Sequence, residues 1–112
     1  MNKTIIGLTE HVTVAGLTGQ KQVVARIDTG ASRSSIDAGL AKELESGPAF
    51  KQSLVRSVHG SSTRHVVRMK LVVAGREFTA SFGLADRAHM KYKVLIGRNV
   101  LRKGFLIDTG KE

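Results

Sequence analysis

The sequence contains no cysteine and no tryptophan, and its 112 residues include only one proline and one tyrosine. Without cysteine, the chain cannot form a disulfide framework, a thiol nucleophile or a thiolate metal site, and this composition suits a reducing compartment. No apolar run is long enough to cross a bilayer, and the N-terminal segment lacks the apolar region of a secretory signal. We therefore expect a cytoplasmic protein with no membrane contact.

Charge is distributed unevenly along the chain, whose net charge is +9. Residues 1–56 hold seven basic and five acidic side chains, whereas residues 57–112 hold 11 basic and four acidic ones. Such a field favours anionic partners, including nucleic acid, an acidic membrane surface or an acidic peptide. The alternative is a solvated basic surface with no specific partner.

The length and the 12 glycines predict one small domain, residues 1–112, built from short strands and tight turns. Alternating or continuous apolar residues predict strands near residues 12–14, 20–27, 94–96 and 105–107, and a hairpin over residues 64–84. Helix-forming residues predict a helix over residues 38–45, capped by Asp37, and a helical turn over residues 98–102. The expected fold class is all-β, a small barrel with one or two short helices.

The tripeptide Asp28-Thr29-Gly30 follows one of the predicted strands. It places a carboxylate at a strand end, a hydroxyl beside it, and a glycine that lets another backbone or a substrate approach closely. Taken alone, these residues are typical of an ordinary turn. The same tripeptide returns at Asp108, so the chain offers two candidate carboxylates.

The residues around the first tripeptide resemble a known family. The segments RIDTGASRSSID and RHVVRMKLVVAGREFTASFGLADRAHMKYKVLIGRNVLRKGFLID resemble the single-domain retropepsin-like family often labelled ATP-dependent zinc proteases. That family is associated with ATP-grasp ligases of the RimK type, so the resemblance implies such a ligase as a partner. The resemblance covers roughly residues 4–110. It implies a closed retropepsin-type barrel and an aspartic endopeptidase.

The resemblance also implies roles for individual residues. Asp28 would be the catalytic aspartate, one of two carboxylates that share a proton and activate a water molecule. The second carboxylate would be Asp108 or the Asp28 of a second copy, and we favour a symmetric homodimer. Thr29 would tie the two active-site loops together through its hydroxyl, and Gly30 and Ala31 would border the substrate.

The glycine- and serine-containing segment over residues 57–64 is predicted to be a mobile loop. Its residues His59, Gly60 and Ser61 are the best candidates for the tip of a flap that closes over substrate. Arg56 and Arg64 bracket this segment and are candidate substrate-binding residues, because basic groups around a cleft favour acidic peptides. A glutamate-rich tail is the substrate suggested by these charges together with the ligase association.

Metal and nucleotide cofactors are not expected. The four histidines are scattered at positions 11, 59, 65 and 89, no HExxH motif occurs, and no phosphate-binding glycine loop is present. Two other functions stay open: a basic barrel that binds nucleic acid, and a dimeric interaction module whose Asp28 is inactive. The scarcity of aromatic residues for base stacking argues against nucleic acid.

Overall fold

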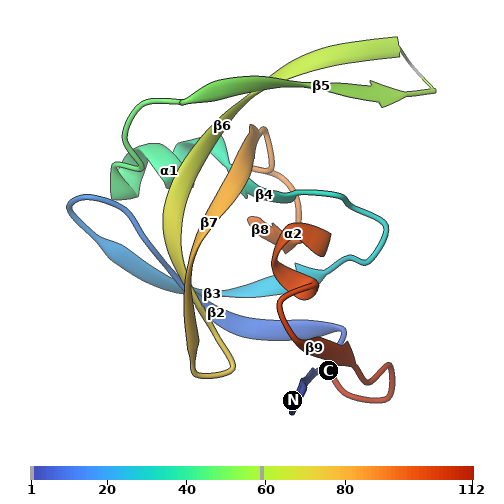
Figure 1. Ribbon diagram of the computed structural model, residues 1–112. Coiled ribbons are helices and arrows are strands. Elements are labelled where there is room, and N and C mark those ends of the chain that lie inside the picture. The colour runs from blue at the N-terminus through green and yellow to red at the C-terminus, as the bar shows by residue number, and fades with distance from the viewer. Residues whose placement is uncertain (1, 59) are drawn as a thin grey trace.

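The computed structural model describes residues 2–58 and 60–112, which form nine strands and two short helices (Figure 1). The N-terminal half contains β1 (Thr4–Ile6), β2 (Thr9–Ala15), β3 (Gln20–Ile27), β4 (Ser34–Asp37), α1 (Ala38–Leu44) and β5 (Lys51–Ser57). The C-terminal half contains β6 (Gly60–Val73), β7 (Arg76–Ala85), β8 (Val94–Ile96), α2 (Arg98–Leu101) and β9 (Phe105–Ile107). Within these residues, no helix is long and apolar enough to span a membrane.

Hydrogen-bonded pairing closes six of the described strands into a barrel. The strand order is β2, β3, β8, β4, β7, β6, and β6 then pairs back with β2. The closing contact aligns Val12 with Val73 and Ala15 with Lys70. Closure removes the free edges that an open sheet of this size would expose.

Of the described strands, β1, β5 and β9 lie outside the closed ring. The strand β5 pairs only with the first part of the long strand β6, and this hairpin projects beyond the barrel (Figure 1). The strands β1 and β9 form a separate parallel pair, so the two ends of the chain lie together (Figure 1).

The interior of the barrel is filled mainly by aliphatic side chains, as the scarcity of aromatic residues predicts. Alternation in β2, β3 and β6 turns every second residue inward. The largest fully buried side chains are Phe82, Ile6, Ile36, Leu71, Ile96, Val12, Val14, Val66, Val67, Val73, Val94 and Val100. Burial of this apolar surface is the main force that holds the strands together.

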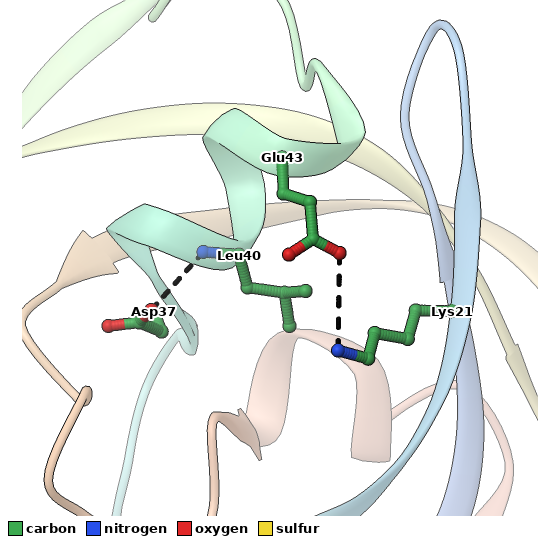
Figure 2. A network of polar contacts seen from close by, with 4 residues as sticks. All are labelled: Lys21, Asp37, Leu40 and Glu43. Atoms are coloured by element: carbon green, nitrogen blue, oxygen red, sulfur yellow. Dashed lines mark hydrogen bonds and ion pairs between the residues drawn. The ribbon is translucent and has the colours of Figure 1, made fainter.

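The two predicted helices are confirmed within one residue at their C-terminal ends. The carboxylate of Asp37 accepts a hydrogen bond from the backbone N–H of Leu40 at 3.2 Å, so Asp37 caps α1 as predicted (Figure 2). The helix ends at Glu45, which adopts a left-handed conformation with φ of 56°.

The prediction of a loop over residues 57–64 is wrong for Ser57, which ends β5, and for residues 60–64, which belong to β6. Their small polar side chains suggested a loop, but backbone pairing with β5 runs without a break from Ser57 opposite Gly60 to Lys51 opposite Val66. Gly60, with φ of 114°, adopts the conformation that the turn requires. His59 lies outside the described residues.

The sequence also gave no signal for β4. All four of its residues are buried, including the two serines and Asp37, so the alternation of polar and apolar residues that marks a half-exposed strand is missing. The strand lies inside the sheet between β7 and β8.

Replacement of Phe82 by alanine should lower the free energy of unfolding by about 3 to 5 kcal/mol, because the ring is fully buried and its loss leaves a cavity. Denaturant unfolding monitored by circular dichroism measures this loss. Val58→Ala is the matched control, since Val58 is 96% exposed and should unfold like the parent protein. Equal stability of the two variants would contradict the placement of Phe82 in the core.

Candidate active site

The loop that carries Asp28 starts where β3 leaves the barrel wall. The backbone N–H of Asp28 donates to the carbonyl of Ile96 in β8 at 2.9 Å, and the N–H of Ile27 donates to the carbonyl of Leu8 at 3.0 Å. These bonds hold the aspartate at the end of a buried parallel strand pair. In Figure 1 the loop after β3 bulges from the barrel on the side toward which the β5–β6 hairpin also extends.

The backbone after Asp28 folds into a tight turn. One carboxylate oxygen of Asp28 accepts a hydrogen bond from the N–H of Gly30 at 2.9 Å, and the carbonyl of Asp28 accepts one from Ala31 at 3.3 Å. Asp28 is half-buried, whereas Thr29 and Gly30 are exposed. Its second carboxylate oxygen receives no hydrogen bond from the described residues. The turn therefore presents Thr29 and Gly30 at the surface of the single chain.

The helix α2 fixes the far side of this loop. The N–H of Arg98 donates to the carbonyl of Ala31 at 2.8 Å, and its guanidinium donates to the carbonyl of Thr29 at 2.9 Å. Gly97 is required here, because a Cβ at this position would lie 2.7 Å from the backbone carbon of Arg33. The loop and the start of α2 thus pack backbone against backbone.

Asn99 joins three elements beneath the loop. Its side-chain oxygen accepts hydrogen bonds from the N–H of Ser34 at 2.9 Å and the hydroxyl of Ser34 at 2.8 Å. Its side-chain nitrogen donates to the carbonyl of Ser81 at 3.0 Å, and the Ser34 hydroxyl accepts from the N–H of Gly97 at 3.0 Å. Sequence reasoning did not assign Ser34 or Asn99 to the site. The sequence signal that could have identified Asn99 is the LIGRN stretch, which begins in β8 and supplies both Gly97 and Asn99.

Asp108 makes the same local turn as Asp28 in a different setting. Its carboxylate accepts from the N–H of Gly110 at 2.9 Å, and its own N–H donates to the carbonyl of Ile6 at 2.8 Å. The turn is held by residues near the N-terminus, where the N–H of Leu8 donates to the carbonyl of Lys111 at 2.8 Å. Asp108 is exposed, and among the described residues its turn lacks the hydrogen bonds to Arg98 of α2 that Thr29 and Ala31 make in the turn at Asp28.

The remaining predicted site residues lie along the β5–β6 hairpin. Gly60 and Ser61 stand at its exposed tip, and Arg56 pairs with Ser61 across the two strands. Arg64 lies nearer the barrel, half-buried, and its guanidinium is 3.5 Å from the hydroxyl of Ser35. The hairpin therefore connects an exposed tip to a basic side chain that contacts β4.

The site is surrounded by positive charge. Burial lowers the pKa of Arg87, and the neighbouring charges of Arg64 and Arg26 lower it further, against the opposing effects of Asp37 and Asp28. Arg87 is held by its backbone N–H, which donates to Asp37 at 2.9 Å, and by its side chain, which donates to the carbonyl of Tyr92 at 2.8 Å. Among residues 2–58 and 60–112, no three His, Asp or Glu side chains gather as a metal site.

The sequence of this chain matches a known protein family. The profile of the RimB-like family, described as the retropepsin-like aspartic endopeptidase RimB, matches residues 42–112. The chain belongs to this family. The match to the RimB-like profile covers the β5–β6 hairpin, β7, β8 and α2, and it begins after the loop that carries Asp28. The resemblance inferred from the sequence is therefore confirmed at the level of the family.

Solved structures confirm the retropepsin-type fold of this RimB-like chain. A Legionella pneumophila protein of unknown function matches with a TM-score of 0.63 and 17% identity, covering 96% of this chain and 94% of the other. The protease of simian foamy virus (mac) matches at 0.62 and 18%, over 84% and 91%. The inhibitor-bound EIAV protease matches at 0.62 and 18%, over 84% of each chain. At these identities the likeness shows the fold alone.

A curated relative is a probable alpha-L-glutamate ligase of Parasynechococcus marenigrum (strain WH8102). It is 28% identical over 132 aligned positions, which cover 95% of the RimB-like chain. The chain spans only 28% of that ligase's length. A segment similar to this chain therefore occurs within a much longer protein.

Asn99→Ala should destabilise the fold by about 1 to 3 kcal/mol and loosen the loop over residues 28–34, because Ser34 and Ser81 lose their shared partner. Amide chemical shifts and hydrogen exchange of residues 28–34 measure the loosening, and denaturant unfolding measures the stability. Lys42→Ala, on the exposed face of α1, is the control and should change neither. Unchanged exchange of these amides in Asn99→Ala would show that α2 does not hold the loop.

Proposed function

We propose that this chain is an aspartic endopeptidase that acts as a symmetric homodimer, with Asp28 of each copy forming the catalytic pair. The observation that carries the proposal is the anchored turn at Asp28, which α2 and Asn99 hold at the edge of a retropepsin-type barrel. Family membership supports the same activity. The carboxylate is held in place yet half-exposed, as a group that must meet water and substrate requires.

The reaction needs two carboxylates, and each chain supplies one that is anchored in this way. One carboxylate, ionised, takes a proton from a water molecule as the water oxygen attacks the peptide carbonyl carbon. The other, protonated, donates its proton to the carbonyl oxygen. When the tetrahedral intermediate collapses, the carbon–nitrogen bond breaks, and the first carboxyl gives the proton it took from water to the leaving nitrogen. A hydroxyl of the intermediate returns its proton to the second carboxylate, which restores the pair.

The exposed residues of the turn support a second copy as the source of the other carboxylate. In a symmetric dimer, Thr29 of each copy would meet the opposite loop, and its exposure in the single chain leaves it available. Gly30 and Ala31 would border the substrate, and the hairpin tip with Gly60 and Ser61 would close over it and exclude water. Asp108 would remain a turn residue.

An apolar face near the same end of the molecule suits the dimer contact. Ile5 and Leu106 are paired across β1 and β9, so their side chains share one face, and they are 56% and 53% exposed. Leu8, whose carbonyl binds the N–H of Ile27 just before the active-site turn, is also exposed. Burial of such a face against a second copy would stabilise the dimer and place the two turns together.

The substrate we propose is an acidic peptide, in particular a glutamate-rich tail. The surface around the loop and hairpin carries Arg26, Arg56 and Arg64, which would attract carboxylates. The similar segment inside a probable alpha-L-glutamate ligase links this sequence to a protein named for a reaction on glutamate. Association with an ATP-grasp ligase and a cytoplasmic location stay predictions of the same proposal.

Asp28→Asn should abolish cleavage of peptides, whereas Asp108→Asn should retain kcat within about threefold, because only Asp28 is proposed to meet the substrate. Oligo-glutamate-tailed and neutral peptides are incubated with each variant from acid to neutral pH, and products are read by mass spectrometry.

Equal loss in both variants would mean that the pair is Asp28 with Asp108 of the same chain. Absence of cleavage by the parent protein, with a dimer present, would favour a non-catalytic basic module that binds a protein partner or nucleic acid.

Leu106→Lys should shift the protein from dimer to monomer and reduce cleavage in parallel, because a charge would be buried at the proposed contact. Analytical ultracentrifugation over a range of concentrations measures the shift. Leu17→Lys is the control, since Leu17 is 76% exposed in the turn between β2 and β3. A dimer unaffected by Leu106→Lys would place the contact elsewhere.

A further inference from the structure

The strand pairing places a row of residues side by side across the barrel wall. The row includes Arg26, two positions before Asp28. Arg26 in β3 pairs with Leu95 in β8, Leu95 pairs with Ser35 in β4, and Ser35 pairs with Gly83 in β7. Residues paired in adjacent strands share a face, so this row lies opposite the core-facing residues of β3. Arg26 precedes Asp28 by two residues, which spans roughly 7 Å along a strand. The row therefore borders the candidate catalytic residue.

Arg64 reaches this row from the β5–β6 hairpin. Gly83 carries no side chain in its path, and the Cδ of Arg64 lies 3.7 Å from where a Cβ on Gly83 would be. The guanidinium thereby crosses β7 and comes within 3.5 Å of the Ser35 hydroxyl. Arg26 starts two strands away from Ser35, about 10 Å across the sheet. Both Arg26 and Arg64 act electrostatically on Arg87, which places both charges near one buried group.

Neither Arg26 nor Arg64 has a carboxylate partner within residues 2–58 and 60–112. Among the described residues, the ion pairs join Lys21 to Glu43 and Lys111 to Glu10, and neither involves Arg26 or Arg64. Figure 2 shows the first pair and the cap made by Asp37. Both oxygens of Asp37 accept backbone N–H groups, from Leu40 and from Arg87. An anion brought by a ligand would therefore be the counter-charge of this row.

We propose that Arg26 and Arg64, together with the Ser35 hydroxyl, form a specificity subsite that binds the side-chain carboxylate of an acidic residue close to the cleaved bond. This inference rests on the proposed peptidase function and names the residues that would select its substrate. Two guanidinium forks and a hydroxyl donor match a carboxylate, which accepts hydrogen bonds at both oxygens. A neutral glutamine at the same position offers one oxygen and no charge.

The test compares peptides that differ only by glutamate or glutamine near the cleaved bond. Arg64→Gln and Arg26→Gln should each lower kcat/KM for the glutamate peptide about 10- to 100-fold, with little change for the glutamine peptide. Lys70→Gln is the matched control, because this substitution also removes one positive charge from β6. Lys70 lies six residues further along the strand than Arg64, roughly 20 Å away. Its glutamate preference should equal that of the parent protein.

A charge reversal separates recognition from a structural role. Arg64→Glu should invert the preference, so that a lysine peptide is cleaved faster than a glutamate peptide. Arg64→Lys should keep part of the glutamate preference, since it retains charge but loses the fork. An unchanged ratio of glutamate to glutamine cleavage in Arg26→Gln and Arg64→Gln would overturn the subsite.

Binding distinguishes failure of this inference from failure of the peptidase proposal. If the parent protein cleaves nothing, calorimetry with an oligo-glutamate peptide still compares the parent with Arg64→Gln and Lys70→Gln. Weaker binding by Arg64→Gln alone supports the subsite without catalysis. Equal binding by all three proteins overturns it.

Discussion

The hydrogen bonds of Asn99 are the constraint on which the candidate site depends. One amide side chain joins Ser34, at the start of β4, to Ser81 in β7, while Gly97 of the same short segment binds the hydroxyl of Ser34. A buried polar group is costly unless each of its hydrogen bonds is made, so this arrangement stabilises one geometry and disfavours others. Because Arg98 also holds the carbonyls of Thr29 and Ala31, the position of the Asp28 turn follows from α2.

The two Asp-Thr-Gly copies show how little a tripeptide determines by itself. Both aspartates accept a hydrogen bond from the glycine two residues later at 2.9 Å, which is the turn that the tripeptide predicts. Among the described residues, only the first copy is hydrogen-bonded to α2, and it alone continues from a strand of the closed barrel. The second follows β9 in the separate two-stranded sheet. The difference between a candidate catalytic group and a turn residue therefore lies in what surrounds identical local chemistry.

In the folded chain, particular basic side chains lie near the candidate site. A net charge of +9 indicates only that anions are attracted, and it does not distinguish nucleic acid from an acidic peptide. Arg26 and Arg64 come from strands 38 positions apart in the sequence, and the missing side chain of Gly83 lets Arg64 approach β4. Neither cation has a carboxylate partner among the described residues, and under the proposed function both would favour an acidic peptide.

Local patterns in the sequence were enough for the fold class, the two helices, most strands and the carboxylate at the end of β3. Periodicity and turn residues act over a few positions, and those short-range preferences survive in the folded chain. The sequence did not indicate β1, β5, the fully buried β4, or the strand character of residues 60–64. Nor did it indicate that Ser34, Ser81 and Asn99 meet. The position of β4 and the meeting of Ser34, Ser81 and Asn99 depend on contacts between segments far apart in the chain, where burial on both faces overrides local preference. Residues 60–64 become a strand because they pair with the adjacent strand β5. The sequence alone therefore determined the Asp-Thr-Gly turn at the end of a strand. Closure of the barrel decided which side chains surround that turn, because it brings distant strands together.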